Sequence, residues 1–221
     1  NRFIDLDYAY EKDFRKHIID AYAEVAGVEV KRKHGRVYTS EQDKKRVNKI
    51  LDNKSDFISI EISDTWGAKQ WPFENYKELI RLLKRDGHKV FGIGLTSHPI
   101  GDMGFDENYI NIFSPMETAE FMRHSSLHIG HEGLLGHFAQ ALNIPHVLIY
   151  CCTSPEYVSD TSLSTWRGVI SPVACQGCRH VHAAGCMVIC KRDYECTKRI
   201  SVEMVYEKCK ELIDESILCP G

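Results

Sequence analysis

The chain of 221 residues has no apolar run approaching the roughly 20 residues that a membrane-spanning helix requires, and no signal peptide is visible. It also has no excess of positive charge, because 28 lysines and arginines stand against 31 aspartates and glutamates. This balance disfavours non-specific binding to nucleic acid. We therefore expect a cytoplasmic protein that has no transmembrane segment and binds no nucleic acid.

The glycine pattern G-x-G-x-x-G of dinucleotide-binding folds is absent, which removes the main support for a nicotinamide-dependent enzyme. Internal repeats and low-complexity segments are absent too. Hydrophobic residues make up 43% and charged residues 27% of the chain, which excludes a disordered protein. The first residue is Asn1 rather than methionine, as in a processed or truncated product.

The first 55 residues show helical patterns and no strand signal. Apolar residues at helical spacing between Asp13 and Val28 predict an amphipathic helix that stops near Gly27. Ser40 is a suitable N-cap for a second, very polar helix through Leu51. We interpret residues 1–55 as a helical linker or as the tail of an N-terminal domain.

From Asp56 onward, predicted strands alternate with predicted helices. The strands are Phe57–Ile62, Lys89–Leu95, Tyr109–Phe113, Leu127–Ile129, Val147–Cys151 and Val169–Val173; the helices are Phe73–Arg85, one opening at Ser114, Leu134–Leu142 and Ser201–Glu215. Such repeated units predict an α/β domain over residues 56–221, with a Rossmann-like parallel sheet flanked by helices. In sheets of this kind the ligand binds at the C-terminal ends of the strands.

Three predicted loops lie at that edge. The first offers Lys69 together with the hydroxyl of Thr65, the charge and short hydrogen bonds that a pyrophosphate requires. An ordinary loop with a solvated lysine is the alternative interpretation of this segment. The second loop follows the fourth predicted strand, Leu127–Ile129. It includes Gly133 and Glu132, whose carboxylate is suited to accept hydrogen bonds from ribose hydroxyls. The third includes Thr96, which we expect to border a base or a sugar.

The helix that begins at Leu134 presents its N-terminus to the same edge, where an anion is favoured. Gly133 and Gly136 are expected to let the backbone approach a ligand closely. His137, on the first turn of this helix, fits a packed and hydrogen-bonded core residue better than a catalytic one.

Taken together and in this order, these segments resemble the C-terminal domain of the heptosyltransferase family of glycosyltransferases, which have GT-B architecture. The family's K-x-W-P motif corresponds to Lys69–Pro72, and its acidic residue, glycines and His/Ala helix correspond to Glu132–Leu142. The resemblance continues through Pro145–Tyr150 and covers roughly Phe57–Glu215. One departure is His131-Glu132-Gly133, where many members have Asp-Ser/Thr-Gly; another is the displacement of a second glycine to Gly136.

The resemblance implies a function as well as a fold. It assigns Thr65, Lys69, Glu132 and Gly133 to the nucleotide-diphosphate sugar donor. The implied reaction transfers a sugar, for which a heptose is one candidate, to a carbohydrate or protein acceptor. In this family the acceptor site and the catalytic base belong to the N-terminal domain. The catalytic residues are therefore unknown from this sequence. The acceptor half is expected from an N-terminal acceptor domain or from a partner chain, and a homo-oligomer is a further expectation. The alternative is a non-catalytic, metal-stabilised binding or assembly module.

Nine cysteines are the compositional exception, and five of them lie between positions 175 and 196. A C-x-x-C turn followed by further cysteines is typical of a closed tetrahedral metal site. We predict a structural zinc or iron ion in this cysteine knuckle; the predicted ligands are Cys175, Cys178, Cys190 and Cys196, with Cys186 as a substitute. Disulfides and inert thiols are the alternatives. Relatives that glycosylate bacterial autotransporters carry a similar insertion that looks like an iron-binding finger.

Overall fold

The computed structural model describes residues 15–64, 66–180 and 190–218. Within them, one six-stranded sheet has the strand order β3-β2-β1-β4-β5-β6, and every neighbouring pair is parallel. The strands are β1 (Phe57–Ser63), β2 (Val90–Leu95), β3 (Glu107–Asn108), β4 (Ser125–His131), β5 (His146–Tyr150) and β6 (Trp166–Ile170). The predicted parallel α/β architecture is confirmed.

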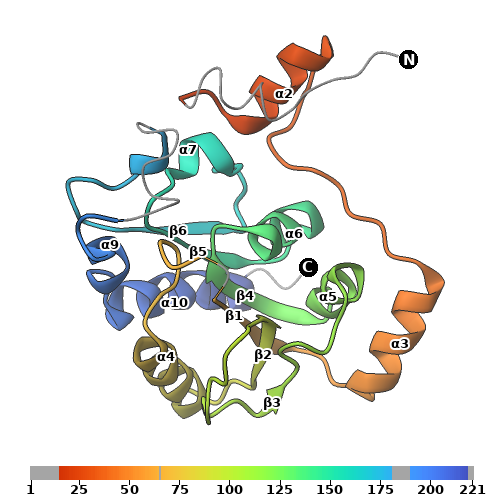
Figure 1. Cartoon of the computed structure of the whole chain (residues 1–221). Helices are drawn as coiled ribbons and strands as arrows, with labels where there is room; N and C mark the ends of the chain where they lie inside the picture. Colours follow the sequence, from red (N-terminus) through yellow and green to blue (C-terminus); the bar gives the residue numbers. More distant parts are fainter. Residues whose placement is uncertain (1–14, 65, 181–189, 219–221) are drawn as a thin grey trace.

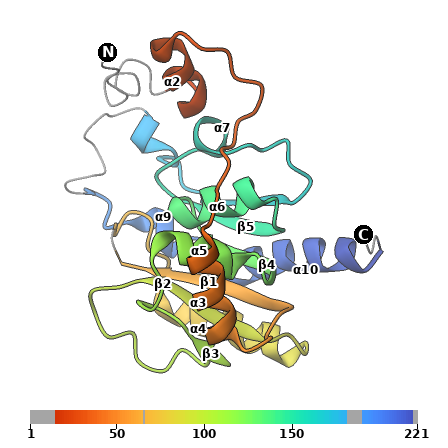
Figure 2. The ribbon, with the colours of Figure 1, turned by 90° about the vertical axis from the view of Figure 1, so that its right-hand side faces the viewer.

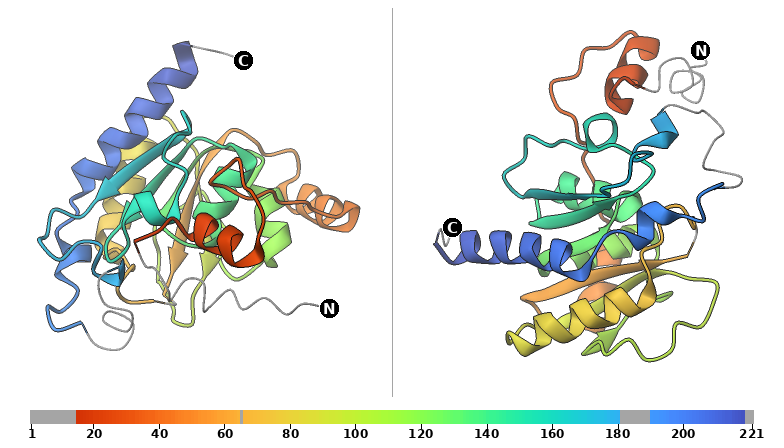
Figure 3. Two further views of the ribbon diagram at one scale, coloured as in Figure 1. Left: turned by 90° about the horizontal axis from the view of Figure 1, so that it is seen from above. Right: turned by 90° about the vertical axis from the view of Figure 1, so that its left-hand side faces the viewer.

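Helices cover both faces of this sheet (Figure 1). They are α2 (Ile18–Ala26), α3 (Glu41–Leu51), α4 (Phe73–Arg85), α5 (Pro115–Met122), α6 (Leu134–Leu142), α7 (Pro155–Val158), α9 (Glu195–Lys198) and α10 (Val202–Leu218), with a 3-10 turn η1 (Cys178–His180). Helix α10 runs across β4, β5 and β6 and contacts α4 (Figure 3). Helix α3 packs on α5, and α2 contacts α7 away from the sheet (Figure 2). No helix among the described residues is long and apolar enough to cross a membrane.

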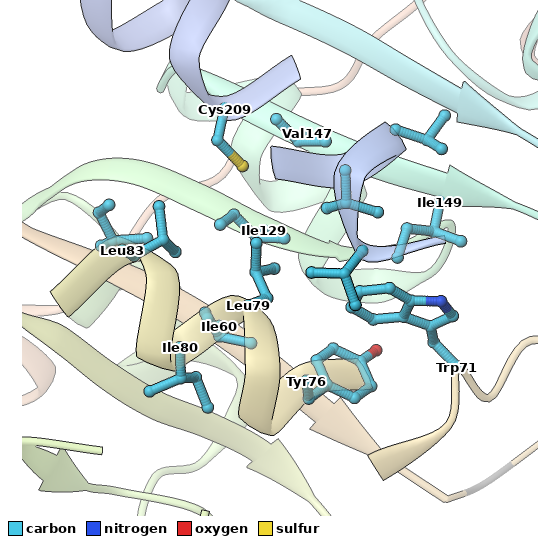
Figure 4. Close-up of a cluster of buried hydrophobic side chains, with 14 of the residues drawn as sticks. Ile60, Trp71, Tyr76, Leu79, Ile80, Leu83, Ile129, Val147, Ile149 and Cys209 are labelled. Carbon is cyan, nitrogen blue, oxygen red and sulfur yellow. The ribbon is translucent and has the colours of Figure 1, made fainter. Parts of the chain in front are cut away.

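The larger core lies between the sheet and the α4–α10 layer (Figure 4). Ile60, Ile129 and Val147 point from three adjacent strands toward Leu79 of α4 and Cys209 of α10. Successive side chains on a strand alternate between its two faces. The opposite face of β1 therefore presents a different set of residues.

The second face of β1 changes from apolar to polar along its length. It begins at Phe57, whose ring stacks on Phe91 at 4.3 Å between centroids and packs against Phe121 of α5. It continues with Ser59 and then Glu61, both buried. The polar end of this face is the C-terminal end of the strand, so the fold carries a buried carboxyl group to the edge where a ligand is expected.

Several predicted elements are confirmed and two are wrong in position. Helices α4 and α6 have the predicted bounds, and Ser40 is the predicted N-cap of α3, where it forms a capping box with Asp43. The strand predicted at Tyr109–Phe113 is wrong, because Asn111 adopts a left-handed conformation (φ 63°) that ends extended chain. The third strand is β3, immediately before this segment.

The sixth strand was predicted at Val169–Val173, whereas β6 spans Trp166–Ile170. The chain leaves the sheet at Ser171, directly before Pro172, which has no N–H to donate to a neighbouring strand. β6 therefore pairs with β5 only up to Ile170.

The indole of Trp71 joins the loop after β1 to the segment that precedes α10. Trp71 is fully buried, and its Nε1 donates a hydrogen bond to the Ile200 carbonyl at 2.9 Å. We expect Trp71→Phe to lower the free energy of unfolding by about 1–3 kcal/mol, because the carbonyl loses a buried partner. Chemical denaturation measures this change. The matched control is Trp66→Phe at the partly exposed Trp66, and an equal loss there would contradict the prediction.

Candidate functional site

A cleft of about 370 Å³ opens at the C-terminal ends of β1, β2 and β4. The strand order reverses direction between β1 and β4, and ligands of open α/β sheets bind at such a switch point. The lining residues come from the ends of these strands, from adjoining loops and from α5 and α6: Glu61, Ser63, Trp66, Lys69, Gly94, Leu95, Phe113, Pro115, Thr118, His131, Glu132, Gly133, Leu134 and Leu135.

An ion pair between Lys69 and Glu132 lies in this cleft. Lys69 Nζ donates to Glu132 Oε2, and the two side chains are only 12% and 8% exposed. The ammonium group also lies 4.5 Å from the centroid of the Trp66 ring. Burial acts to raise the pKa of Glu132, but the charge and hydrogen bond of Lys69 outweigh it, so this pKa lies below its ordinary value. The cleft therefore holds a buried ammonium group next to an ionised carboxylate.

The N-terminus of α6 faces the same cleft through Gly133, Leu134 and Leu135. Its first turn contains no acidic residue, so the N–H groups and the positive end of the helix dipole are left for an anion. On this turn, Nε2 of His137 lies 3.8 Å from Glu132 Oε1. Lys69 and the helix N-terminus thus offer two positive features to one bound anion.

The opposite part of the cleft is apolar. Leu95 and Leu134 line it although they are 62% and 52% exposed, and Phe113 and Pro115 complete this part. Exposed leucines beside an aromatic ring favour a flat, apolar group such as a nucleobase. The cleft therefore combines an end that presents Lys69 and a helix N-terminus with an apolar end.

A second acidic residue, Glu61, lines the cleft beside His131. Glu61 Oε1 lies 3.4 Å from His131 Nε2, and His131 Nδ1 lies 3.1 Å from the carbonyl oxygen of Glu132. Burial raises the pKa of Glu61, with His131 and Lys69 acting in the opposite direction. The sequence interpretation missed Glu61, whose signal is that it is the one charged residue in the strand segment Phe57–Ile62.

The structure brings together Lys69, Glu132, Gly133 and Leu134 as the sequence predicted, while Thr65 lies outside the described residues. Thr96 is not among the residues that line the cleft. Its N–H donates to Asn111 Oδ1 at 2.9 Å, and its hydroxyl donates to the His98 carbonyl at 2.9 Å. Both polar groups of Thr96 therefore build the turn after β2.

That turn is fixed by Asp64, which sequence reasoning also missed. Asp64 Oδ2 accepts hydrogen bonds from the backbone and hydroxyl of Ser97 and lies 2.8 Å from His98 Nδ1. The hydrogen bond with His98, followed by those with Ser97, lowers the pKa of Asp64 to about 2. The Asp64 carboxylate thereby ties the loop after β1 to the loop after β2 at the rim of the cleft.

Gly136 has a packing role rather than the ligand contact that the sequence suggested. A Cβ at this position would lie 3.0 Å from a methyl group of Leu148 on β5. The absence of a side chain therefore lets α6 pack closely on the sheet. This close packing holds the N-terminus of α6 at the cleft.

The predicted metal ligands do not form a centre among the described residues. Within those residues, no group of three or more Cys, His, Asp or Glu side chains is placed to hold a metal ion, and Cys186 lies outside them. Cys196 is buried and hydrogen-bonded with Cys151; this bond and burial raise the pKa of the Cys151 thiol. Cys175 and Cys178 lie partly buried on the turn that leads into η1.

The cysteine-rich segment nevertheless contacts the lysine-bearing loop. Cys178 and Tyr194 pack with Trp66 around the buried residues Ala68 and Cys152. Trp66 and Ala68 belong to the same turn as Lys69, whose N–H donates to the Trp66 carbonyl at 2.9 Å. The conformation of the cysteine segment therefore affects where Lys69 is held.

The six-stranded parallel sheet flanked by helices defines an α/β fold that matches GT-B glycosyltransferases. A family model for Glycosyltransferase family 9 (heptosyltransferase) matches residues 5–184, which is more than half of the chain. The chain belongs to this family. No curated protein matches it.

Three solved structures illustrate the similarity. A family 9 glycosyl transferase from Veillonella parvula has 16% identity and a TM-score of 0.68 over 91% of this chain and 61% of its own. The ADP-heptose lps heptosyltransferase II of E. coli has 15% identity and a TM-score of 0.66 over 91% and 63%. TibC, described as a dodecameric iron-containing heptosyltransferase in complex with ADP-D-β-D-heptose, has 21% identity and a TM-score of 0.69 over 93% and 56%; the same protein is assigned to enterotoxigenic E. coli.

At these identities the similarity establishes the fold. The chain spans less than two thirds of the length of these structures, between 56% and 63%.

Proposed function

We propose that this chain is the donor-binding half of a glycosyltransferase that transfers a heptose from an ADP-linked donor to a carbohydrate or protein acceptor. Family membership supports the reaction class, and the ADP-heptose bound to TibC supports the donor. In this proposal residues 56–221 form the donor domain, and residues 1–55 join it to a half that carries the acceptor and the catalytic base.

The observation that carries the proposal is the buried Lys69–Glu132 pair beside the N-terminus of α6. A diphosphate placed there accepts a charge-assisted hydrogen bond from Lys69 and backbone hydrogen bonds from the helix. Negative charge increases on the diphosphate as the bond to the sugar breaks. Both groups therefore bind the departing diphosphate more tightly than the intact donor, which lowers the barrier.

The remaining features of the cleft suit the nucleoside. The apolar part formed by Leu95, Phe113 and Leu134 suits the adenine ring. The second oxygen of Glu132 suits ribose hydroxyls, which donate to a carboxylate. Glu132 thereby has one oxygen for Lys69 and another for the nucleoside.

The test is calorimetric binding of ADP, GDP, UDP and dTDP to the chain. We expect ADP to bind most tightly, in the micromolar range. Preference for another nucleotide would change the donor that we propose, and no binding by any of the four would overturn the function. Turnover of ADP-heptose by the complete protein then distinguishes an enzyme from a non-catalytic binding module.

We also propose a structural zinc or iron ion held by Cys175, Cys178, Cys190 and Cys196. The C-x-x-C turn, with Gly177 at φ 71°, and the iron of TibC support it. Because Cys196 hydrogen-bonds with Cys151, it must leave the core to become a ligand; Cys186 is the alternative. Because Cys178 and Trp66 pack against the same buried cluster, such an ion would hold the Lys69 loop in place.

Metal analysis of the purified chain tests this proposal. We expect about one zinc or iron ion per chain, and loss of the ion in the Cys175→Ser/Cys178→Ser double variant. Replacing the buried Cys209, which lies on α10 and faces the core, provides the matched control. A metal-free chain that still binds ADP would overturn the metal site and leave the donor site standing.

A further inference from the structure

Glu61 and His131 form a chain of polar contacts that ends at the proposed donor loop. Because a carbonyl only accepts, the 3.1 Å contact between His131 Nδ1 and the Glu132 carbonyl places a hydrogen on Nδ1. In a neutral imidazole Nε2 is then a bare acceptor, and it faces Glu61 Oε1 at 3.4 Å. A favourable contact between these two acceptors requires one added proton, carried by either group.

The surroundings of Glu61 make its charge costly. It is 4% exposed, and among the described residues its Oε2 has no hydrogen-bond partner. The nearby ammonium of Lys69 is already paired with Glu132. Although Glu61 accepts a hydrogen bond from the backbone of His131, burial with one unpaired oxygen outweighs it, and an added proton is favoured.

A bound nucleotide-diphosphate sugar increases this cost. Its diphosphate brings two negative charges to a cleft that already contains the carboxylates of Glu61 and Glu132 and one lysine. Like charges in a buried site disfavour one another's ionised forms. Protonation of the Glu61–His131 pair removes one negative charge, and the hydrogen bond so formed holds His131 against the Glu132 carbonyl.

We propose that binding of the diphosphate donor is coupled to uptake of one proton by the Glu61–His131 pair, with Glu61 as a positioning residue for the donor loop. The proposal rests on the proposed function, since the diphosphate is its ligand. The proton comes from the solvent and remains on the pair while the donor is bound. Affinity for the donor therefore falls as pH rises through the range in which the unliganded pair loses this proton.

The other titratable groups around Glu61 are Lys69 and Glu132 at the cleft, His128 on β4 and Tyr76 on α4. His128 is fully buried, and burial together with neighbouring histidines lowers its pKa to about 3, so it stays neutral. Burial raises the pKa of Tyr76 far above neutrality. Glu132 has a pKa below its ordinary value and stays ionised. The exposed His137 beside Glu132 is the competing site for the proton, and a separate variant tests it.

The experiment is calorimetric binding of ADP-glucose between pH 6 and 8.5, in pairs of buffers that differ in ionisation enthalpy. ADP-glucose is the probe because its diphosphate does not itself titrate in this range. For the wild-type chain we expect proton uptake to rise to about one proton per ligand as the pH increases. Over the same increase in pH, the affinity for ADP-glucose should fall about tenfold. Glu61→Gln keeps the shape of the protonated carboxyl and can donate to His131 Nε2. It should therefore bind equally tightly at all pH values, with the affinity that the wild type has at low pH.

Glu120→Gln, at a buried carboxylate outside the cleft, is the matched control and should retain the proton uptake. Wild-type binding without pH dependence or proton uptake would overturn the inference and leave the donor site intact. Uptake that persists in Glu61→Gln and disappears in His137→Gln would also overturn it. The absence of any ADP-glucose binding would overturn both this inference and the proposed function.

Discussion

Replacing Lys69 with alanine is expected to lower the affinity for ADP by about 10- to 200-fold. The variant removes a charge-assisted hydrogen bond to the diphosphate, which is worth about 1.5–3 kcal/mol. It also leaves the buried carboxylate of Glu132 without its cation, so that this group repels the incoming phosphates. Calorimetric titration of ADP measures the loss.

The same variant should reduce the free energy of unfolding by about 3 kcal/mol, because it leaves the buried carboxylate of Glu132 unpaired. The double variant Lys69→Ala/Glu132→Gln separates the two effects: it should recover stability but not ADP affinity. Lys77→Ala, at an exposed ion pair on α4, is the control and should leave both quantities unchanged. An ADP affinity of Lys69→Ala within about twofold of wild type, which is close to the error of the titration, would show that Lys69 does not contact the donor.

Much of the fold was predictable because local signals agreed with one another. Helix α4 has an apolar stripe and a defined start and end, and α5 has a capping box from Ser114 to Glu117. The segment from Tyr109 to Phe113 misled because its aromatic residues are typical of a strand. In the structure Tyr109 and Phe113 pack with Phe121 of α5, and the turn at Asn111 prevents this segment from pairing with β2 as a strand.

The site was predictable only in part. Lys69 and Glu132 belong to motifs and follow strands, so their convergence at one edge follows from a parallel sheet. Their direct ion pair does not, since it depends on how two loops fold across 63 positions of sequence. Glu61 was missed because a single carboxylate in a strand gives no periodic signal. Its role depends on a neighbour, His131, that the sequence showed only as a departure from the family pattern.

Gly94 is the position at which a single methyl group should damage both the fold and the cleft. It lies at the end of β2 with φ 127°, opposite Ile62 of β1, and a Cβ would lie 2.1 Å from the Ile62 carbonyl oxygen. Gly94→Ala therefore forces β1 and β2 apart where Ser63 and Leu95 line the cleft. We expect the free energy of unfolding to fall by at least about 3 kcal/mol, from backbone strain and steric overlap together.

Gly87→Ala provides the matched comparison. Gly87 also has a positive φ, 93°, but no atom lies within 4 Å of the position of an added Cβ. Its substitution carries only the backbone strain, about 1–2 kcal/mol, and should leave ADP affinity unchanged. Denaturation and ADP titration of both variants therefore separate strain from overlap. Equal losses of stability in the two variants would show that overlap with the Ile62 carbonyl adds nothing to the backbone strain.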